Sequence, residues 1–273
     1  MEAAPMMEDP SVEHYRAAVC GSVEAYRALR EQALELGLAG EVSRLESLTA
    51  AECYAYLAAS IGDAQDRRRL AGILIARADY RAMRGCTNPF FRMEAAHWLR
   101  GLADAGDVEA ADQLDAMGVG PVWEEDRAQT ELRTNILANF ADAARGDLNA
   151  LASMSENNLR SVADGDGRLE ALVKAEQFAR IGSFSGDPLM RMRLAGVVLL
   201  RREYELRDGG SRFRACWAAN ESVGLLLTLC NEGIADAWPP LANLIASLSR
   251  PEVALIAADI PEVLSVINPE GHA

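Results

Sequence analysis

The chain has 273 residues, of which 50% are hydrophobic and 25% are charged, and its formal net charge is −14 with a sequence pI of about 4.7. The large hydrophobic share argues against disorder over most of the length, and a net negative field repels phosphate backbones and anionic lipid. Nucleic acid is therefore not an expected partner. Membrane insertion is not expected either, because no apolar run approaches the length of a membrane span.

The N-terminal stretch and the cysteines bear on the compartment. Residues 1–20 contain several acidic side chains and no apolar run, so no Sec-type signal peptide is predicted. The five cysteines are odd in number and widely spaced, without a CxxC pair or a Cys/His cluster of zinc spacing. We expect a cytoplasmic protein with reduced thiols. Export by a route other than Sec stays open.

Six glycines recur along the chain at intervals of 40 to 47 residues, by subtraction of their numbers. They are Gly21, Gly62, Gly106, Gly146, Gly186 and Gly233. Four are followed directly by an aspartate, at Asp63, Asp107, Asp147 and Asp187. Glycine tolerates the left-handed backbone that closes a helix, and aspartate caps the free N–H groups of the next one. Each glycine is therefore predicted to join two helices.

Apolar residues recur at fixed distances from these glycines. Eight positions after them lie Leu29, Leu70, Leu114, Met154, Leu194 and Leu241. Eight positions before three of them lie the aromatic residues Tyr54, Trp98 and Phe178. Intervals of four and eight place side chains on one face of a helix, and burying a leucine contributes about 1.5–3 kcal/mol. Because one helix pair cannot hide both of its apolar faces, neighbouring pairs are expected to stack.

A fixed period of this size is typical of stacked two-helix units. The sequence therefore predicts an all-α protein, an α-solenoid of about five to six antiparallel helix pairs wound as a right-handed superhelix. Pro251 and Pro261 are expected to open two short terminal helices that cap the stack. The predicted domains are a disordered tail at 1–10, a single helical-repeat domain at 11–268 and a C-terminal tail at 269–273.

The stretch from Ala95 to Gly146 carries the most specific motif. In order it holds Ala95, Trp98, Leu102, Gly106-Asp107, Ala110, Leu114 and Gly118-Val119-Gly120. This order resembles the Sel1-like subclass of tetratricopeptide-like repeats, which pairs an Ala–Trp-aromatic first helix with a glycine turn and a second helix ending in Gly-x-Gly. Residues 171–200 are similar. The resemblance implies an adaptor or scaffold in bacterial regulation, secretion or assembly.

Signals for catalysis are weak. No P-loop, HExxH, GxSxG or dinucleotide-binding motif is present, and the three histidines are far apart in the sequence. The run Asp164–Gly167 fails as a calcium loop, since Val162 and Val173 fall where acidic ligands belong. We therefore expect no enzyme, no catalytic residues, no cofactor and no metal; an enzyme of unknown type is the least favoured hypothesis.

A partner groove is predicted on the non-core side of the first helices. The candidate partner-binding residues are Tyr56, His97, Arg100, Phe140, Gln177 and Arg180. The run Arg67–Arg69 could meet an acidic partner but is interpreted as a solvated helix face. The tryptophans, which can anchor interfaces, are interpreted as core.

The leading functional hypothesis is a non-enzymatic scaffold or adaptor that binds a partner protein or peptide in this curved groove. The alternative is an acidic inhibitor, immunity protein or secretion chaperone that masks a basic target. Salt dependence of the complex would separate the two, because charge masking weakens steeply with salt. The identity of the partner and self-association stay open.

Overall fold

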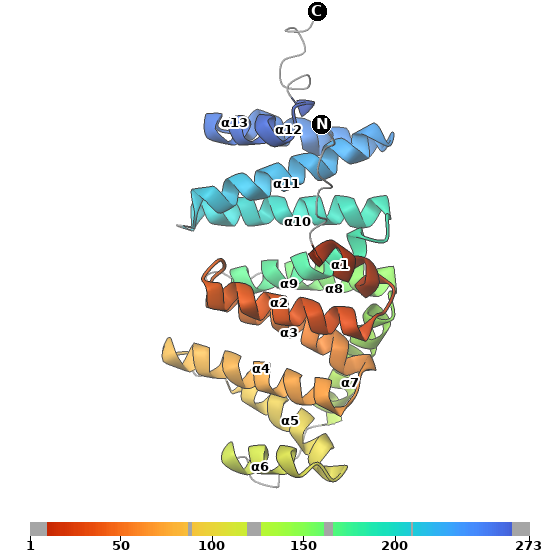
Figure 1. The fold of residues 1–273 in the computed structure, drawn as a ribbon, viewed down its shortest axis with the longest axis vertical. Helices are drawn as coiled ribbons and strands as arrows, with labels where there is room; N and C mark the ends of the chain where they lie inside the picture. The colour runs from red at the N-terminus through yellow and green to blue at the C-terminus, as the bar shows by residue number, and fades with distance from the viewer. Residues whose placement is uncertain (1–9, 87–88, 119–126, 161–165, 209, 264–273) are drawn as a thin grey trace, which may run out of the picture. The chain divides into compact units, whose positions relative to one another are not determined.

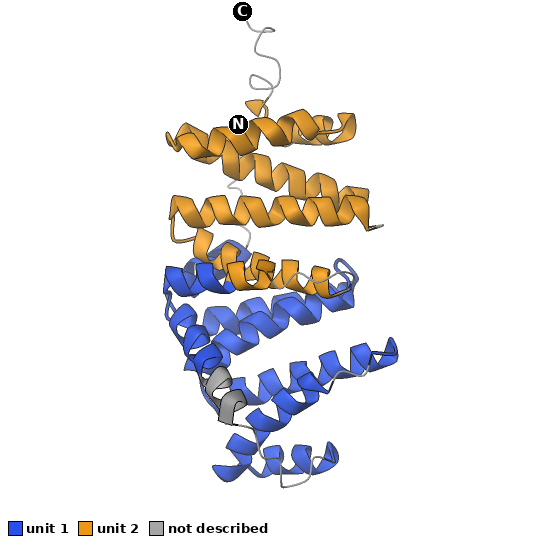
Figure 2. Ribbon diagram, turned by 180° about the vertical axis from the view of Figure 1, so that it is seen from behind, with its two compact units in different colours: residues 1–154 blue, residues 155–273 orange. Residues whose placement is uncertain are grey.

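The computed structural model describes residues 10–86, 89–118, 127–160, 166–208 and 210–263 (Figure 1). Within these ranges every regular element is helical, so the fold is all-α as predicted. The chain divides into two compact units, Met1–Met154 and Ser155–Ala273 (Figure 2). The single domain at 11–268 remains a prediction. The two predicted tails lie outside the described residues, except that Pro10 already begins the first helix.

Unit 1 contains seven complete helices in its described part and the beginning of an eighth. They are α1 (Pro10–Val19), α2 (Val23–Ala39), α3 (Arg44–Ile61), α4 (Ala64–Met83), α5 (Phe90–Asp104), α6 (Val108–Ala116), α7 (Arg127–Ala144) and α8 (Leu148–Arg160), which continues into unit 2. From α1 to α6, each helix packs against the next one along the chain. This order of contacts gives unit 1 a layered arrangement of neighbouring helices.

Unit 2 continues with α9 (Asp166–Ser183), α10 (Pro188–Arg207), α11 (Arg212–Asn231), the 3₁₀ helix η1 (Ala235–Ala237), α12 (Trp238–Ser247) and α13 (Arg250–Asp259). Helix α10 packs against both α9 and α11, and α11 also packs against α12 and α13. The unit 2 part of α8 is tied to α9, because the Ser155 hydroxyl donates to the carbonyl of Ala175 at 3.0 Å. Pro251 lies in the first turn of α13, as predicted; a helix opened by Pro261 would fall largely in residues outside the description.

Each recurring glycine lies between two consecutive helices, and five of the six have a positive φ of 82° to 94°. Gly62 differs, with φ −89° and ψ −160°. Glycine is needed there for space: an added Cβ would lie 2.6 Å from the carbonyl oxygen of Ala58 and would collide with the Asp66 carboxylate. The left-handed turn predicted at Gly62 is therefore wrong, although a glycine is still required.

The predicted caps are present after five of the glycines. Asp63, Asp107, Asp147 and Asp187 each accept hydrogen bonds from backbone N–H groups of the following first turn. Ser22 does the same for Ala25 at 3.2 Å. After Gly233 no side chain of the described residues caps the helix, and the chain passes through η1 before α12 begins. The longest interval, from Gly186 to Gly233, holds α10 and α11, which have 20 residues each.

The predicted core positions are buried. All six residues that lie eight positions after a recurring glycine are no more than 9% exposed. Before Gly146 the pattern fails, because Ala138 and Asp142 of α7 are exposed. Helix α7 instead packs against α3, and the Tyr26 hydroxyl at the start of α2 donates to the carbonyl of Ala144 at 3.2 Å. This non-sequential contact turns another face of α7 inward.

Candidate functional site

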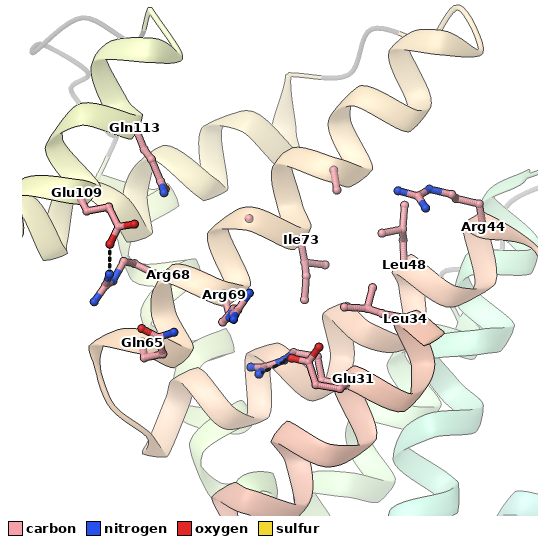
Figure 3. Close-up of a pocket in the computed structure, with 13 residues that line it drawn as sticks. Glu31, Leu34, Arg44, Leu48, Gln65, Arg68, Arg69, Ile73, Glu109 and Gln113 are labelled. Carbon is pink, nitrogen blue, oxygen red and sulfur yellow. Dashed lines mark hydrogen bonds and ion pairs between the residues drawn. The ribbon is translucent and has the colours of Figure 1, made fainter. Parts of the chain in front are cut away.

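Unit 1 has a cavity of about 530 Å³ between α2, α3, α4 and α6 (Figure 3). Its charged and amide lining side chains are Arg30, Glu31, Arg44, Gln65, Arg68, Arg69, Glu109 and Gln113. The remaining lining residues are aliphatic or small: Leu34, Leu48, Gly72, Ile73 and Ala76. Four arginines against two glutamates make this site cationic within a chain whose net charge is −14.

The longest wall of the cavity is one face of α4. From Gln65 to Ala76, the lining residues of this helix recur at intervals of three and four, with Arg68 and Arg69 adjacent, and this spacing places them on a common helical stripe. Gly72 lies in the middle of the stripe and is exposed, and a Cβ added to it would meet nothing within 4 Å. The wall is therefore open at its centre.

Two of the four arginines are fixed by carboxylates. Arg30 is buried, donates to Glu31 at 2.9 Å and lies 3.6 Å from Asp66. Arg68 bonds to Glu109 and lies 3.2 Å from Asp107. Both side chains are therefore held within the cavity wall by these carboxylates.

The other two arginines, Arg44 and Arg69, are exposed. Within the part of the chain that the structure describes, neither forms an ion pair or a side-chain hydrogen bond. Most of the other described arginines do meet a carboxylate. Arg44 and Arg69 are thus the cationic groups of the cavity that are available to a ligand.

Asp66 does not line the cavity, but it contacts the lining residue Arg30. Its carboxylate is buried and accepts hydrogen bonds from Arg27 at 2.6 and 2.9 Å and from the backbone N–H of Asp63 at 3.2 Å. Burial by itself would raise the pKa of Asp66, but the Arg27 and Asp63 hydrogen bonds and the charges of Arg27 and Arg30 hold it below its ordinary value of 3.8. The ionised carboxylate therefore holds Arg30 in place.

This carboxylate gives a pH-dependent prediction. A lowered folded-state pKa means that Asp66 stabilises the fold above pH 3.8 and loses this effect as the pH falls through the folded value. We expect Asp66→Asn to lower the free energy of unfolding most near neutral pH, with the difference from wild type shrinking below pH 3.8. Urea unfolding across that range measures it. The exposed Asp79→Asn is the control, and a pH-independent difference for Asp66→Asn would contradict the assignment.

Two of the six predicted partner-binding residues lie against each other in the interior. The Tyr56 ring stacks on Phe140 at a centroid distance of 4.6 Å and meets Trp98 edge-on at 6.4 Å. Tyr56 is only 8% exposed, so its predicted place on a free groove wall is wrong. The reason is α7, which brings Phe140 onto this side of α3 and covers it.

The other four predicted residues are not assembled into one site. His97 is exposed and Arg100 half-buried on α5, whereas Gln177 and Arg180 belong to α9 in unit 2. Arg180 donates to Glu221 of α11 at 2.5 and 3.0 Å and to Glu176 at 2.9 Å. Its guanidinium therefore joins two helices of unit 2, a role that the sequence did not indicate.

No sequence pattern indicated Arg44, and the run Arg67–Arg69 did not identify Arg69 as a cavity residue. The run Arg67–Arg69 was the available signal, and its interpretation as a solvated face holds for Arg67 and Arg69, which are exposed, whereas Arg68 is half-buried and bonds to Glu109. The interpretation of the tryptophans as core is wrong for Trp217 and Trp238, which are both exposed.

Comparisons with known proteins add no assignment. No family model, no curated protein and no solved structure matches the chain. Among the described residues, no group of three His, Cys, Asp or Glu side chains could hold a metal ion. No described helix combines the length and the apolar character that crossing a membrane requires. Fold and site together define an all-helical protein with a cationic cavity.

Proposed function

We propose that this chain is a non-enzymatic scaffold, built as an α-solenoid of stacked helix pairs, that binds an acidic segment of a partner protein in the arginine-lined cavity. The observation that carries the proposal is a pair of exposed arginines, Arg44 and Arg69, that line an open cavity and have no ion-pair partner among the described residues. Arginine is enriched among residues that dominate binding energy, and it binds carboxylates through a planar fork of donors.

The size and chemistry of the cavity support binding rather than catalysis. Its volume of about 530 Å³ is within the usual range for ligand sites. Among its described lining residues there is no serine, cysteine or histidine, the side chains that most often act as nucleophile or general base. None of the five cysteines forms a disulfide in the structure, which supports a reducing compartment such as the cytoplasm.

The proposed site differs from the groove expected from the sequence. The cavity is lined mainly by the second helices α2, α4 and α6, with Arg44 and Leu48 contributed by α3. The expected wall on the first helices is occupied at Tyr56 by Phe140 of α7. In unit 1, the second helices therefore offer the better surface for a partner.

A photocrosslinking experiment tests the proposal in the cells from which the chain comes. p-Benzoylphenylalanine replaces Gly72, which lines the cavity, or Gly101 of α5 as the matched control; both glycines are exposed with nothing within 4 Å of an added Cβ. We expect a stoichiometric protein adduct from position 72 whose crosslinked peptide is acidic. The purified partner should bind the wild-type chain and lose affinity for Arg69→Gln.

The control position decides what a negative result means. Equal labelling from positions 72 and 101 would remove the evidence for the cavity as the contact. An adduct from position 101 alone would move the partner to the first helices and contradict the proposed site. Binding that Arg69→Gln leaves unchanged would also count against it.

A further inference from the structure

The cavity has an apolar centre between its two available cations. In Figure 3, Leu34, Leu48 and Ile73 lie between Arg44 and Arg69. The sequence spacing agrees with this view: Leu48 follows Arg44 by four residues on α3, and Ile73 follows Arg69 by four residues on α4. Residues four apart lie on the same face of a helix, so each wall presents an arginine followed by an aliphatic side chain.

From this arrangement we infer that the cavity binds a segment of a partner chain in which an apolar side chain lies between two carboxylate side chains. The apolar side chain packs against Leu34, Leu48 and Ile73. One carboxylate pairs with Arg44 and the other with Arg69. The open position at Gly72 leaves room for the backbone of the bound segment. This inference rests on the function proposed above and names the ligand of the same site.

The acidic residues of the cavity do not cancel the two arginines. Glu31 accepts from Arg30, and Glu109 accepts from Arg68. Both glutamates therefore pair with guanidinium groups other than those of Arg44 and Arg69. The same two glutamates argue against nucleic acid, because a phosphate backbone would place continuous negative charge beside them in a chain of net charge −14. A free inorganic anion would leave the aliphatic centre unused.

A set of short synthetic peptides tests the inference on the full chain. Each peptide is acetylated and amidated at its ends and carries one leucine flanked by two glutamates, placed one to four positions away in a Gly/Ser host. Binding is followed by fluorescence anisotropy. We expect at least one spacing to bind about tenfold more tightly than its Glu→Gln and Leu→Ser versions, a difference equivalent to about 1.4 kcal/mol.

Variants of the protein provide the matched comparison. Arg44→Gln and Arg69→Gln are each expected to weaken the best peptide by about fivefold, and high salt should weaken it as well. Arg67→Gln is the control, because Arg67 is exposed and adjacent but does not line the cavity. All three variants should keep the wild-type thermal transition, since none of these side chains is ion-paired in the described structure.

Several outcomes would overturn the inference. They are the absence of binding by every peptide, equal effects of Arg44→Gln, Arg69→Gln and Arg67→Gln, or tighter arginine-dependent binding of an oligothymidylate or of inorganic phosphate. If the peptides fail while crosslinking from position 72 still gives a stoichiometric protein partner, the scaffold proposal stands and the ligand chemistry inferred here falls. If both experiments fail, both proposals fall.

Discussion

Replacing Arg77 with methionine is expected to lower the free energy of unfolding by about 3–5 kcal/mol, the usual cost of breaking a buried ion pair. Arg77 is 1% exposed, pairs with the buried carboxylate of Glu52, and lies 4.5 Å above the ring of Phe91. The pair joins α4 to α3, and the ring belongs to α5. Methionine fills part of the volume but leaves the Glu52 carboxylate without this cation. Urea unfolding followed by circular dichroism measures the loss.

Two further variants separate the buried charge from lost packing. Arg77→Met combined with Glu52→Leu should recover more than half of the loss, because apolar pairs of similar volume often replace buried ion pairs at little cost. Arg92→Met breaks the exposed pair between Arg92 and Asp79, joined at 2.8 Å, and should cost less than about 1 kcal/mol. Equal losses for Arg77→Met and Arg92→Met would contradict the buried character of the first pair.

Local features of the fold were predictable because they depend on neighbours in the sequence. A glycine followed by aspartate closes one helix and caps the next, and the structure has this arrangement at Gly106, Gly146 and Gly186. The core positions eight residues later follow from helical spacing alone. At Gly62 the residue type was predictable but its reason was not, because the collision with Ala58 and Asp66 depends on coordinates.

Features that depend on distant contacts were not predictable. The periodic pattern treats every helix pair alike, so it assigned the same facing to α7 as to the other first helices. Helix α7 instead packs against α3, and this long-range packing buries Tyr56 and leaves Ala138 exposed. The sequence of a single helix pair does not indicate that α7 packs against α3.

The candidate site was hidden for the same reason. Its lining residues extend from Arg30 to Gln113 in the sequence and come together only through the packing of α2, α3, α4 and α6. Whether an arginine is available to a ligand depends on the carboxylate opposite it: Glu109 fixes Arg68, whereas Arg69, the next residue, has no such partner among the described residues. Sequence spacing cannot distinguish these two neighbours.

In unit 2, Leu194→Asp is expected to lower the free energy of unfolding by more than about 4 kcal/mol, because a large effect of this kind arises when a charge is buried in a core. Leu194 is 3% exposed and packs with Ala175, Ala179, Val197 and Val198. Neither α9 nor α10 can move away without separating this cluster. Fluorescence-detected urea unfolding, together with circular dichroism of the purified variant, measures the change.

The control for this variant lies on the same helix. Leu189 is 79% exposed in the first turn of α10, so Leu189→Asp loses little packing and places a negative charge near the helix N-terminus, where it is favourable. We expect Leu189→Asp to change the free energy of unfolding by less than about 0.5 kcal/mol. Because both variants change leucine to aspartate in α10, they differ only in whether the side chain points into the core or into solvent.

Similar small losses for the two variants would show that α10 does not bury the face that carries Leu194. The helical register deduced from the recurring glycines would then be wrong in unit 2.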